Sequence, residues 1–262
     1  MRILITYAGL IVAVVMASAC HAPINQQPTT AEIESTGQLA MHGQQSSALR
    51  SLTVWSEQGQ VTAQRELGLA LAAQSEQNAH AVSMPVQQVQ EAQRIQAVHW
   101  LTQAAKGGDA EARFELAEVY YKARLGVQKD AASAWQWYEA AALQGHSKAS
   151  FMLARMSKYG EGVPLSLNTS VHWLQKSADQ GNAQAMFLLS NAYASGEGVA
   201  QDAHQAREWL ERSADGDFPV AIQALAMELD GKVNTDPDAA RRSRHLIKEA
   251  SDERLLRWNK YQ

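Results

Sequence analysis

The stretch Ala97-Val98-His99-Trp100-Leu101-Thr102-Gln103-Ala104-Ala105 decides the fold, because its pattern of one tryptophan among small residues recurs along the chain. Steps of three and four residues place the tryptophan and the small residues on one helical face. One such unit cannot bury its own apolar face, whereas stacked neighbours can, so the sequence predicts an array of helical repeats. We expect the tryptophans to be structural, at the packing seam of the second helices. They are Trp100, Trp137, Trp173 and Trp209, spaced 37, 36 and 36 residues apart, with a worn fifth copy at His245-Leu246 and Ala250.

Two kinds of glycine turn divide each unit into two helices. Each unit opens on a glycine, which suits the left-handed end of the preceding helix, and a polar residue that is placed to cap the next one. These openings are Gly108-Asp109, Gly145-His146, Gly181-Asn182 and Gly216-Asp217. A second turn, such as Gly160-Glu161-Gly162-Val163 or Gly196-Glu197-Gly198-Val199, ends the first helix. The sequence therefore predicts an all-α fold, an α-solenoid of antiparallel helix pairs with about four to five repeats.

The composite motif resembles the Sel-one-like repeat, a subclass of the tetratricopeptide (TPR) superfamily. It reads Gly-Asp-Ala-x-Ala-x-Phe-x-Leu-Ala-x-x-Tyr from Gly108, then Gly-x-Gly-Val, then Ala-x-x-Trp-x-x-x-Ala-Ala. The resemblance covers roughly residues 59–251, with repeats at 59–107, 108–144, 145–180, 181–215 and 216–251, of which the outer two are divergent. It implies a solenoid for protein–protein contact. Bacterial members include secreted and lipid-anchored proteins that serve exopolysaccharide export, envelope regulation and host interaction.

The N-terminal residues predict export through a signal peptide over 1–19. Arg2 precedes an apolar run from Ile3 to Met16, which is too short for a comfortable membrane span. The run leads into Ala17-Ser18-Ala19-Cys20, which resembles a bacterial lipobox, and Cys20 is the only cysteine in the chain. An unpaired exported cysteine needs a use. We therefore expect a lipid at Cys20, a flexible tether over 20–45 and an N-terminal membrane anchor.

The residue after the cysteine indicates the destination. His21 rather than aspartate implies the outer membrane, so the expected location is the bacterial cell envelope, facing the periplasm. Ordinary cleavage after Ala19 is the alternative, and it would give a soluble periplasmic or secreted interaction module.

The array is expected to have helical caps and one irregular segment. Apolar spacing over 46–58 predicts an N-terminal capping helix, and 252–262 predicts a C-terminal one. The Gln-rich stretch from Ala73 to about Gln90 lengthens the first unit. Insertions in repeat arrays map to loops, often on the binding face, so this stretch is read either as a partner contact or as a tolerated loop.

Composition and motifs favour a binding protein over an enzyme. The net charge of −4 gives no basic footprint for nucleic acid. No His-Glu-x-x-His, Cys-x-x-Cys, Gly-x-Ser-x-Gly or Ser-x-x-Lys motif occurs. His99 and His172 share a repeat position but lie two units apart, and packed helices are about 8–10 Å apart against metal–ligand bonds near 2 Å. We expect no catalytic residue, metal or cofactor; a cell-wall-active hydrolase is the rival from another class.

A second ladder is the candidate binding surface. In each of three units, a phenylalanine stands two residues before the repeat leucine. A polar or charged residue stands four residues after that phenylalanine. By superfamily analogy this position lies on the concave face, where it would grip an extended segment of an envelope protein or peptide; packing between repeats is the alternative. The residues are Phe114 with Glu118, Phe151 with Arg155, and Phe187 with Asn191.

Overall fold

The computed structural model describes residues 27–42, 46–77 and 84–230, together with positions 238, 241, 245, 247 and 248. Within these residues the elements are helices: α1 (Thr30–His42), α2 (Ser46–Glu57), α3 (Val61–Gln77), α4 (Met84–Lys106), α5 (Ala110–Lys122), α6 (Ala131–Ala142), α7 (Ser147–Tyr159), α8 (Leu167–Asp179), α9 (Ala183–Ser195), α10 (Ala203–Asp215) and α11 (Pro219–Asp230). The predictions for 1–19, Cys20 and 252–262, and the remaining copy at Leu246 and Ala250, lie outside the described residues.

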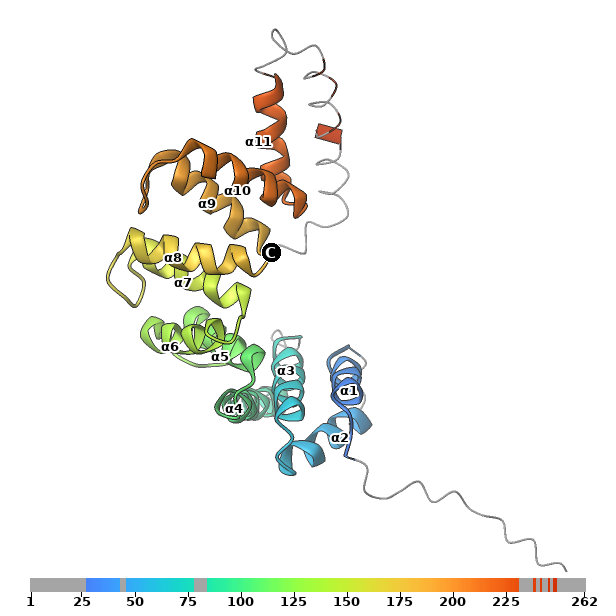
Figure 1. Cartoon of the computed structure of the whole chain (residues 1–262). Coiled ribbons are helices and arrows are strands. Elements are labelled where there is room, and N and C mark those ends of the chain that lie inside the picture. Colours follow the sequence, from blue (N-terminus) through green and yellow to red (C-terminus); the bar gives the residue numbers. More distant parts are fainter. Residues whose placement is uncertain are drawn as a thin grey trace, which may run out of the picture.

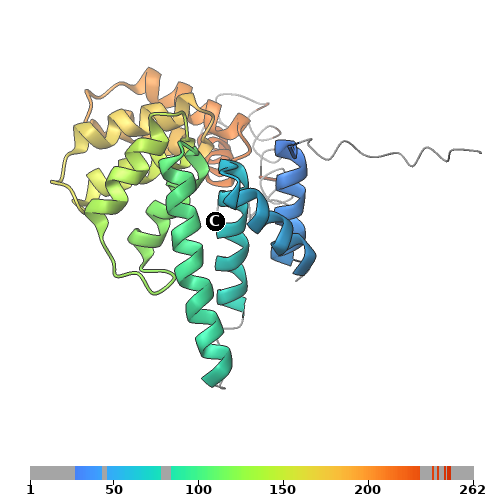
Figure 2. The same ribbon diagram turned by 90° about the horizontal axis from the view of Figure 1, so that it is seen from below.

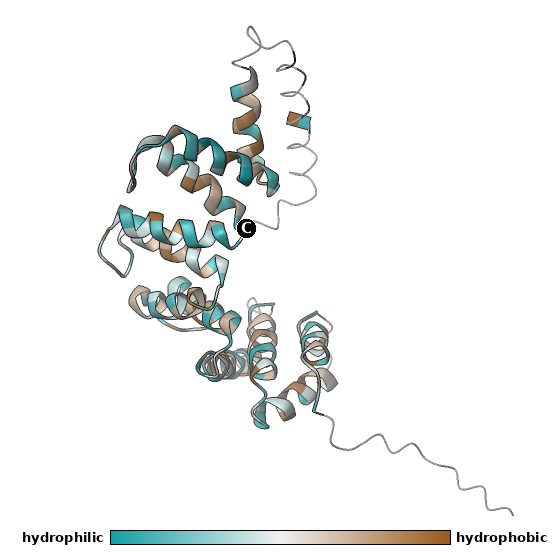
Figure 3. Ribbon diagram, viewed as in Figure 1, coloured by the Kyte–Doolittle hydropathy of each residue, from teal (hydrophilic) through white to brown (hydrophobic). Residues whose placement is uncertain are grey.

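The helices pack as consecutive pairs, which confirms the all-α solenoid. Within a unit α3 packs on α4, α5 on α6, α7 on α8 and α9 on α10, and each second helix also contacts the first helix of the next unit. The pairs follow one another along an arc from α1 to α11 (Figure 1). The visible face of α10 is largely hydrophilic, whereas α9 beneath it and α11 carry more apolar residues (Figure 3).

Side-chain caps define where the repeat helices begin. Each capping residue has extended backbone and accepts a hydrogen bond from a backbone N–H in the first turn, which satisfies one of the donors that a helix leaves unpaired. The caps are Asp109, Asp130, His146, Ser166, Asn182 and Asp202 for α5 to α10 in order. Asp109, His146 and Asn182 follow opening glycines and therefore cap their helices as the sequence predicts. Asp217, after the fourth opening glycine, has a left-handed φ of +61° and lies two residues before the start of α11.

The second glycine of the Gly-x-Gly turns permits close packing between units. Gly162 and Gly198 have φ of +72° and +76°. A Cβ on Gly162 would lie 2.6 Å from the carbonyl of Ala131, and one on Gly198 would lie 2.5 Å from the carbonyl oxygen of Leu167. Each turn thus rests on the start of the second helix of the preceding unit, which explains why the turn needs glycine.

The tryptophans are buried to different depths. Trp173 and Trp209 are buried, whereas Trp100 and Trp137 are half-buried. In the unit of Trp137 the deepest aromatic residue is its neighbour Tyr138, which is fully buried. The packing seam between units therefore contains both the tryptophan and the residue that follows it. Which of the two is more deeply buried differs from unit to unit.

The predicted tether over 20–45 is wrong for residues 30–42, which form α1. Thr29 and Glu32 make a reciprocal capping box, with Thr29 N–H donating to Glu32 Oε2 at 2.8 Å and Glu32 N–H donating to Thr29 Oγ1 at 3.3 Å. Ile33, Gly37 and Ala40 form the buried side of α1. Because α1 packs on both α2 and α3, the array begins with a helix pair, and α2 spans nearly the residues of the predicted 46–58 cap.

The irregular segment predicted over 73–90 is also largely helical. α3 continues to Gln77 and α4 begins at Met84, so only 78–83 lie outside the described residues. Gln74 is buried, and its Nε2 donates to the carbonyl oxygen of Ala40 in α1 at 3.1 Å. The glutamines are helix-forming residues here. Figure 2 shows the resulting long α4 beside α3 and extending past its end.

Candidate partner-binding cleft

The three phenylalanines of the predicted ladder have different surroundings. Phe114 is only 9% exposed, and its ring stacks on His146 with 4.6 Å between centroids. Phe187 is half-buried, and its ring lies 5.5 Å from that of Phe218. Phe151 is half-buried and lines a cleft. The ladder is therefore not one continuous surface, because two of its rings pack against aromatic residues of the following unit.

The cap of the next unit accounts for the stacking of Phe114. His146 caps α7 through Nδ1, which accepts from the Ala149 N–H at 3.1 Å, so Nε2 carries the proton and donates to Glu111 Oε2 at 3.0 Å. These two hydrogen bonds hold the imidazole ring flat against Phe114. The corresponding cap after Phe151 is Asn182, whose short amide offers no ring surface.

Glu118 belongs to the packing as well. It is buried, accepts a hydrogen bond from the Tyr138 hydroxyl and forms an ion pair with Lys122 one turn away. Burial, together with the hydrogen bond to Glu118, raises the pKa of Tyr138. Phe114 and Glu118 are therefore packing residues. The carboxylate of Glu118 already binds Tyr138 and Lys122 within the fold.

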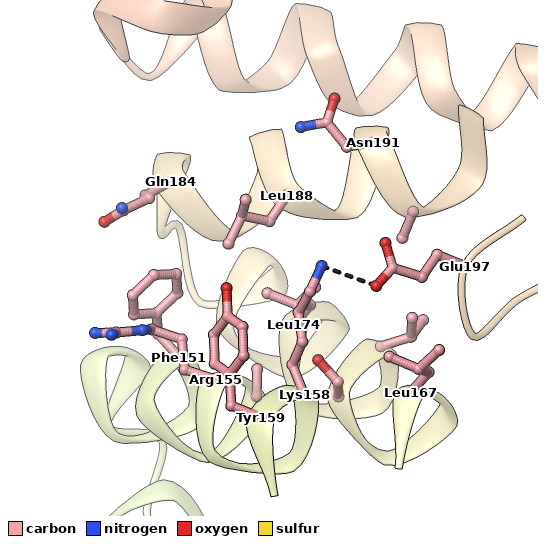
Figure 4. A pocket seen from close by; sticks show the side chains of 14 residues that line it. Phe151, Arg155, Lys158, Tyr159, Leu167, Leu174, Gln184, Leu188, Asn191 and Glu197 are labelled. Carbon is pink, nitrogen blue, oxygen red and sulfur yellow. Dashed lines mark ion pairs between the residues drawn. The ribbon is translucent and has the colours of Figure 1, made fainter. Parts of the chain in front are cut away.

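Phe151, Arg155 and Asn191 meet in a cleft of about 240 Å³ between α7, α8 and α9. Figure 4 shows the side chains of α7 facing those of α9 across it. The floor is apolar and the rim is polar. The floor contains Phe151 and Ala154 of α7, Val171 and Leu174 of α8, and Leu188 of α9; the rim contains Arg155, Lys158, Tyr159, Gln184, Asn191 and Glu197.

One ion pair bridges the two units at the end of the cleft. Lys158 Nζ lies 2.8 Å from Glu197 Oε1, and the two side chains are drawn with a dashed line in Figure 4. Glu197 is the middle residue of the Gly196-Glu197-Gly198 turn, so the turn that fixes unit-to-unit packing also places this carboxylate. The pair neutralises Lys158 and ties the end of α7 to the turn after α9.

Arg155 provides the available charge of the cleft. Its side chain is exposed, and its hydrogen-bond partner among the described residues is the sulfur of Met152, 3.9 Å from Nη1. A thioether is a weak hydrogen-bond acceptor. The guanidinium of Arg155 therefore keeps N–H donors available for a stronger acceptor, such as a carboxylate. Tyr159, 62% exposed, stands beside it as an aromatic anchor that the sequence pattern did not single out.

A second hollow, between α1, α3 and α5, differs in its charges. It has a volume of about 660 Å³ and is lined by Glu34, Glu66, Glu111 and Arg65 among others. Arg65 pairs there with Glu34 at 2.9 Å, Glu66 at 2.8 Å and, through its other terminal nitrogen, Asp109 at 2.9 Å. Three carboxylates thus surround the arginine, so it supports the fold of the N-terminal units.

Two other classes of feature are absent from the described part of the chain. No group of three or more His, Cys, Asp or Glu side chains there is arranged to hold a metal ion. None of the helices in the described ranges combines the length and apolar character needed to cross a membrane.

The comparisons with known proteins agree with this architecture. The Sel1 repeat matches the chain at residues 89–109, 110–146, 147–182 and 183–218. A solved Sel1 repeat protein from Oxalobacter formigenes is 25% identical, with a TM-score of 0.62 and 85% of each chain covered. A protective antigen present in uropathogenic Escherichia coli strains, which displays an SLR fold, is 24% identical with a TM-score of 0.67; the match covers 86% of this chain and 46% of that one. None of the curated proteins matches the chain.

Proposed function

Because the chain belongs to the Sel1 repeat family, we propose that it is a non-catalytic protein–protein interaction scaffold that holds a segment of its partner in the cleft between α7, α8 and α9. Sel1 repeats indicate a scaffold for protein contacts. The cleft supplies what a binding surface needs: an apolar floor for an anchoring side chain, and polar groups around it that fix orientation.

One observation carries the choice of this cleft. The three ladder positions are equivalent in sequence, but among them only the ring of Phe151 lines the α7–α9 cleft. Beside it lies Arg155, which has no carboxylate partner among the described residues. At Phe114 the ring is stacked and the neighbouring Glu118 is engaged in the fold.

The test compares alanine at the two equivalent positions. Phe151→Ala is expected to weaken binding of the partner by at least about 1–2 kcal/mol, while the chain stays folded. Phe114→Ala removes a buried ring and is expected to lower the free energy of unfolding by about 3–5 kcal/mol. The partner is first captured by crosslinking in intact envelopes. Calorimetric titration then gives its affinity, and urea denaturation gives stability.

The reverse pattern contradicts the proposal. If Phe151→Ala destabilises the chain as much as Phe114→Ala and the remaining folded protein binds normally, then Phe151 is a packing residue and the partner lies elsewhere.

We further propose that the scaffold acts in the bacterial cell envelope, anchored to the outer membrane through Cys20 and facing the periplasm, on partners in export, exopolysaccharide assembly or envelope regulation. The support is the sequence Ala17-Ser18-Ala19-Cys20 at the end of an apolar run, with Cys20 as the sole cysteine. A single acyl chain gives only marginal membrane binding, so stable anchoring requires the several chains that lipoprotein processing attaches.

Lipidation is tested by metabolic labelling with a fatty acid. The wild-type chain is expected to incorporate the label and partition with membranes, and Cys20→Ala is expected to lose the label entirely, because no second cysteine is present. Equal labelling of both chains, or of neither, contradicts lipidation at Cys20 and favours the soluble periplasmic or secreted alternative.

A further inference from the structure

We propose that the segment held in the α7–α9 cleft is an acidic peptide, which places a carboxylate on Arg155 and an adjacent apolar side chain on Phe151 and Leu188. This inference rests on the proposed function and specifies the chemistry of the partner at the same site. Its basis is the distribution of charge around the cleft.

Among the charged residues that line the cleft, Arg155 lacks a carboxylate within salt-bridge distance in the described part of the chain. Lys148 and Arg155 lie two turns apart on the same helical side and are both exposed. Within the described residues neither is within salt-bridge distance of a carboxylate, whereas Lys158 pairs with Glu197 at 2.8 Å. The cleft rim therefore carries a net positive charge from Arg155. Lys148 lies outside the cleft lining, and its positive charge helps to lower the pKa of Glu111 in α5.

The neighbouring units show that this charge is particular to α7. Counting from the opening glycine of each unit, the positions of Lys148 and Arg155 are occupied in α5 by Glu111 and Glu118. Both acids have partners inside the fold: Glu111 contacts His146 and Glu118 contacts Tyr138 and Lys122.

In α9 the same two positions carry uncharged amides. Gln184 and Asn191 line the cleft opposite α7, and each offers two donors and one acceptor oxygen. Amides of this kind suit the backbone of a peptide. The guanidinium of Arg155 suits a carboxylate, with which it forms two parallel hydrogen bonds.

The size of the cleft favours a side-chain anchor. Its volume of about 240 Å³ falls below the ~300–1,000 Å³ of pockets that enclose whole small molecules. An apolar side chain on the floor, with an aspartate or glutamate next to it in sequence, uses both the floor and the arginine. Tyr159, exposed beside Arg155, extends the apolar contact at the rim.

A charge-reversal selection tests the proposal. Random linear peptides displayed on phage are selected on the full wild-type chain, on Arg155→Glu and on Arg50→Glu. Arg50 is the matched control because it is exposed on α2, which packs only on α1 and α3 among the principal helix contacts. Circular dichroism melting confirms that each variant is folded.

Wild type and Arg50→Glu are expected to enrich Asp or Glu beside an apolar residue, whereas Arg155→Glu is expected to enrich Lys or Arg there. A peptide selected on wild type is expected to bind Arg155→Glu at least about tenfold more weakly, since charge reversal replaces attraction with repulsion.

The remaining outcomes separate the inference from the proposed function. Peptides that require Phe151 but show no acidic preference, or that bind Arg155→Glu equally well, overturn the inference and leave the cleft as a binding site. If no peptide is enriched, or if enrichment is unaffected by Phe151→Ala, the proposed function fails as well. Dimerisation of the wild-type chain that Arg155→Glu abolishes, measured by analytical ultracentrifugation, assigns the cleft to a second copy and overturns the acidic peptide.

Discussion

Replacing Trp173 by alanine is expected to lower the free energy of unfolding by about 3–5 kcal/mol. The indole is 6% exposed and belongs to a cluster of buried residues that runs from Phe114 to Trp209 and so joins successive units. Lys176 Nζ also lies 5.1 Å from the centre of the ring. Each repeat contacts only its neighbours, so the loss should appear as early melting of the central units.

Urea denaturation followed by circular dichroism measures this effect, with Trp100→Ala as the matched control. Trp100 occupies the same repeat position but is half-buried, so its replacement removes less buried surface and should cost less. A Trp173→Ala chain that melts like wild type but loses its partner would show that this tryptophan faces a ligand instead of the packing seam.

Replacing Gly198 by alanine is expected to cost about 2–5 kcal/mol of stability. The left-handed backbone, with φ of +76°, accounts for about 1–2 kcal/mol in a residue with a Cβ. The new Cβ would lie 2.5 Å from the backbone oxygen of Leu167, and relieving that clash adds about 1–3 kcal/mol. The turn also carries Glu197, so its displacement should disturb the pair with Lys158 across the cleft.

Gly196 in the same turn provides the control. Its φ is +74°, but the nearest atom to a Cβ there is 3.4 Å away, on Gln201. Gly196→Ala therefore bears the backbone strain without the steric clash, and the difference between the two variants in urea denaturation isolates unit-to-unit packing. Equal destabilisation would contradict the role assigned to Gly198 as the contact with α8.

The sequence predicts the repeat part of the fold well because its signals are local. The steps of three and four around each tryptophan, and the glycine followed by a capping residue, act within one or two turns of helix. The N-terminal part is harder to predict. The capping box of Thr29 and Glu32 was available as a signal for α1, but the burial of Gly37 depends on Glu66 of another helix.

The binding surface could be predicted only in part, since a repeat position does not determine its surroundings. Phe114 and Phe151 are equivalent in sequence, but the unit that follows supplies a stacking His146 to one and Asn182 to the other. Arg155 was identified by its spacing from Phe151. Leu188 and Tyr159 were missed, because their roles arise where two units meet.

Site-specific photocrosslinking in intact cells tests the central claim, that the partner occupies the α7–α9 cleft. A photoreactive phenylalanine analogue replaces Tyr159, which is 62% exposed at the cleft rim. In a matched chain it replaces Leu143, which is 69% exposed in the turn after α6 and is not a lining residue. We predict a discrete adduct from position 159, lost on addition of Phe151→Ala, and none from position 143. An adduct from 143 but not from 159 would contradict the account.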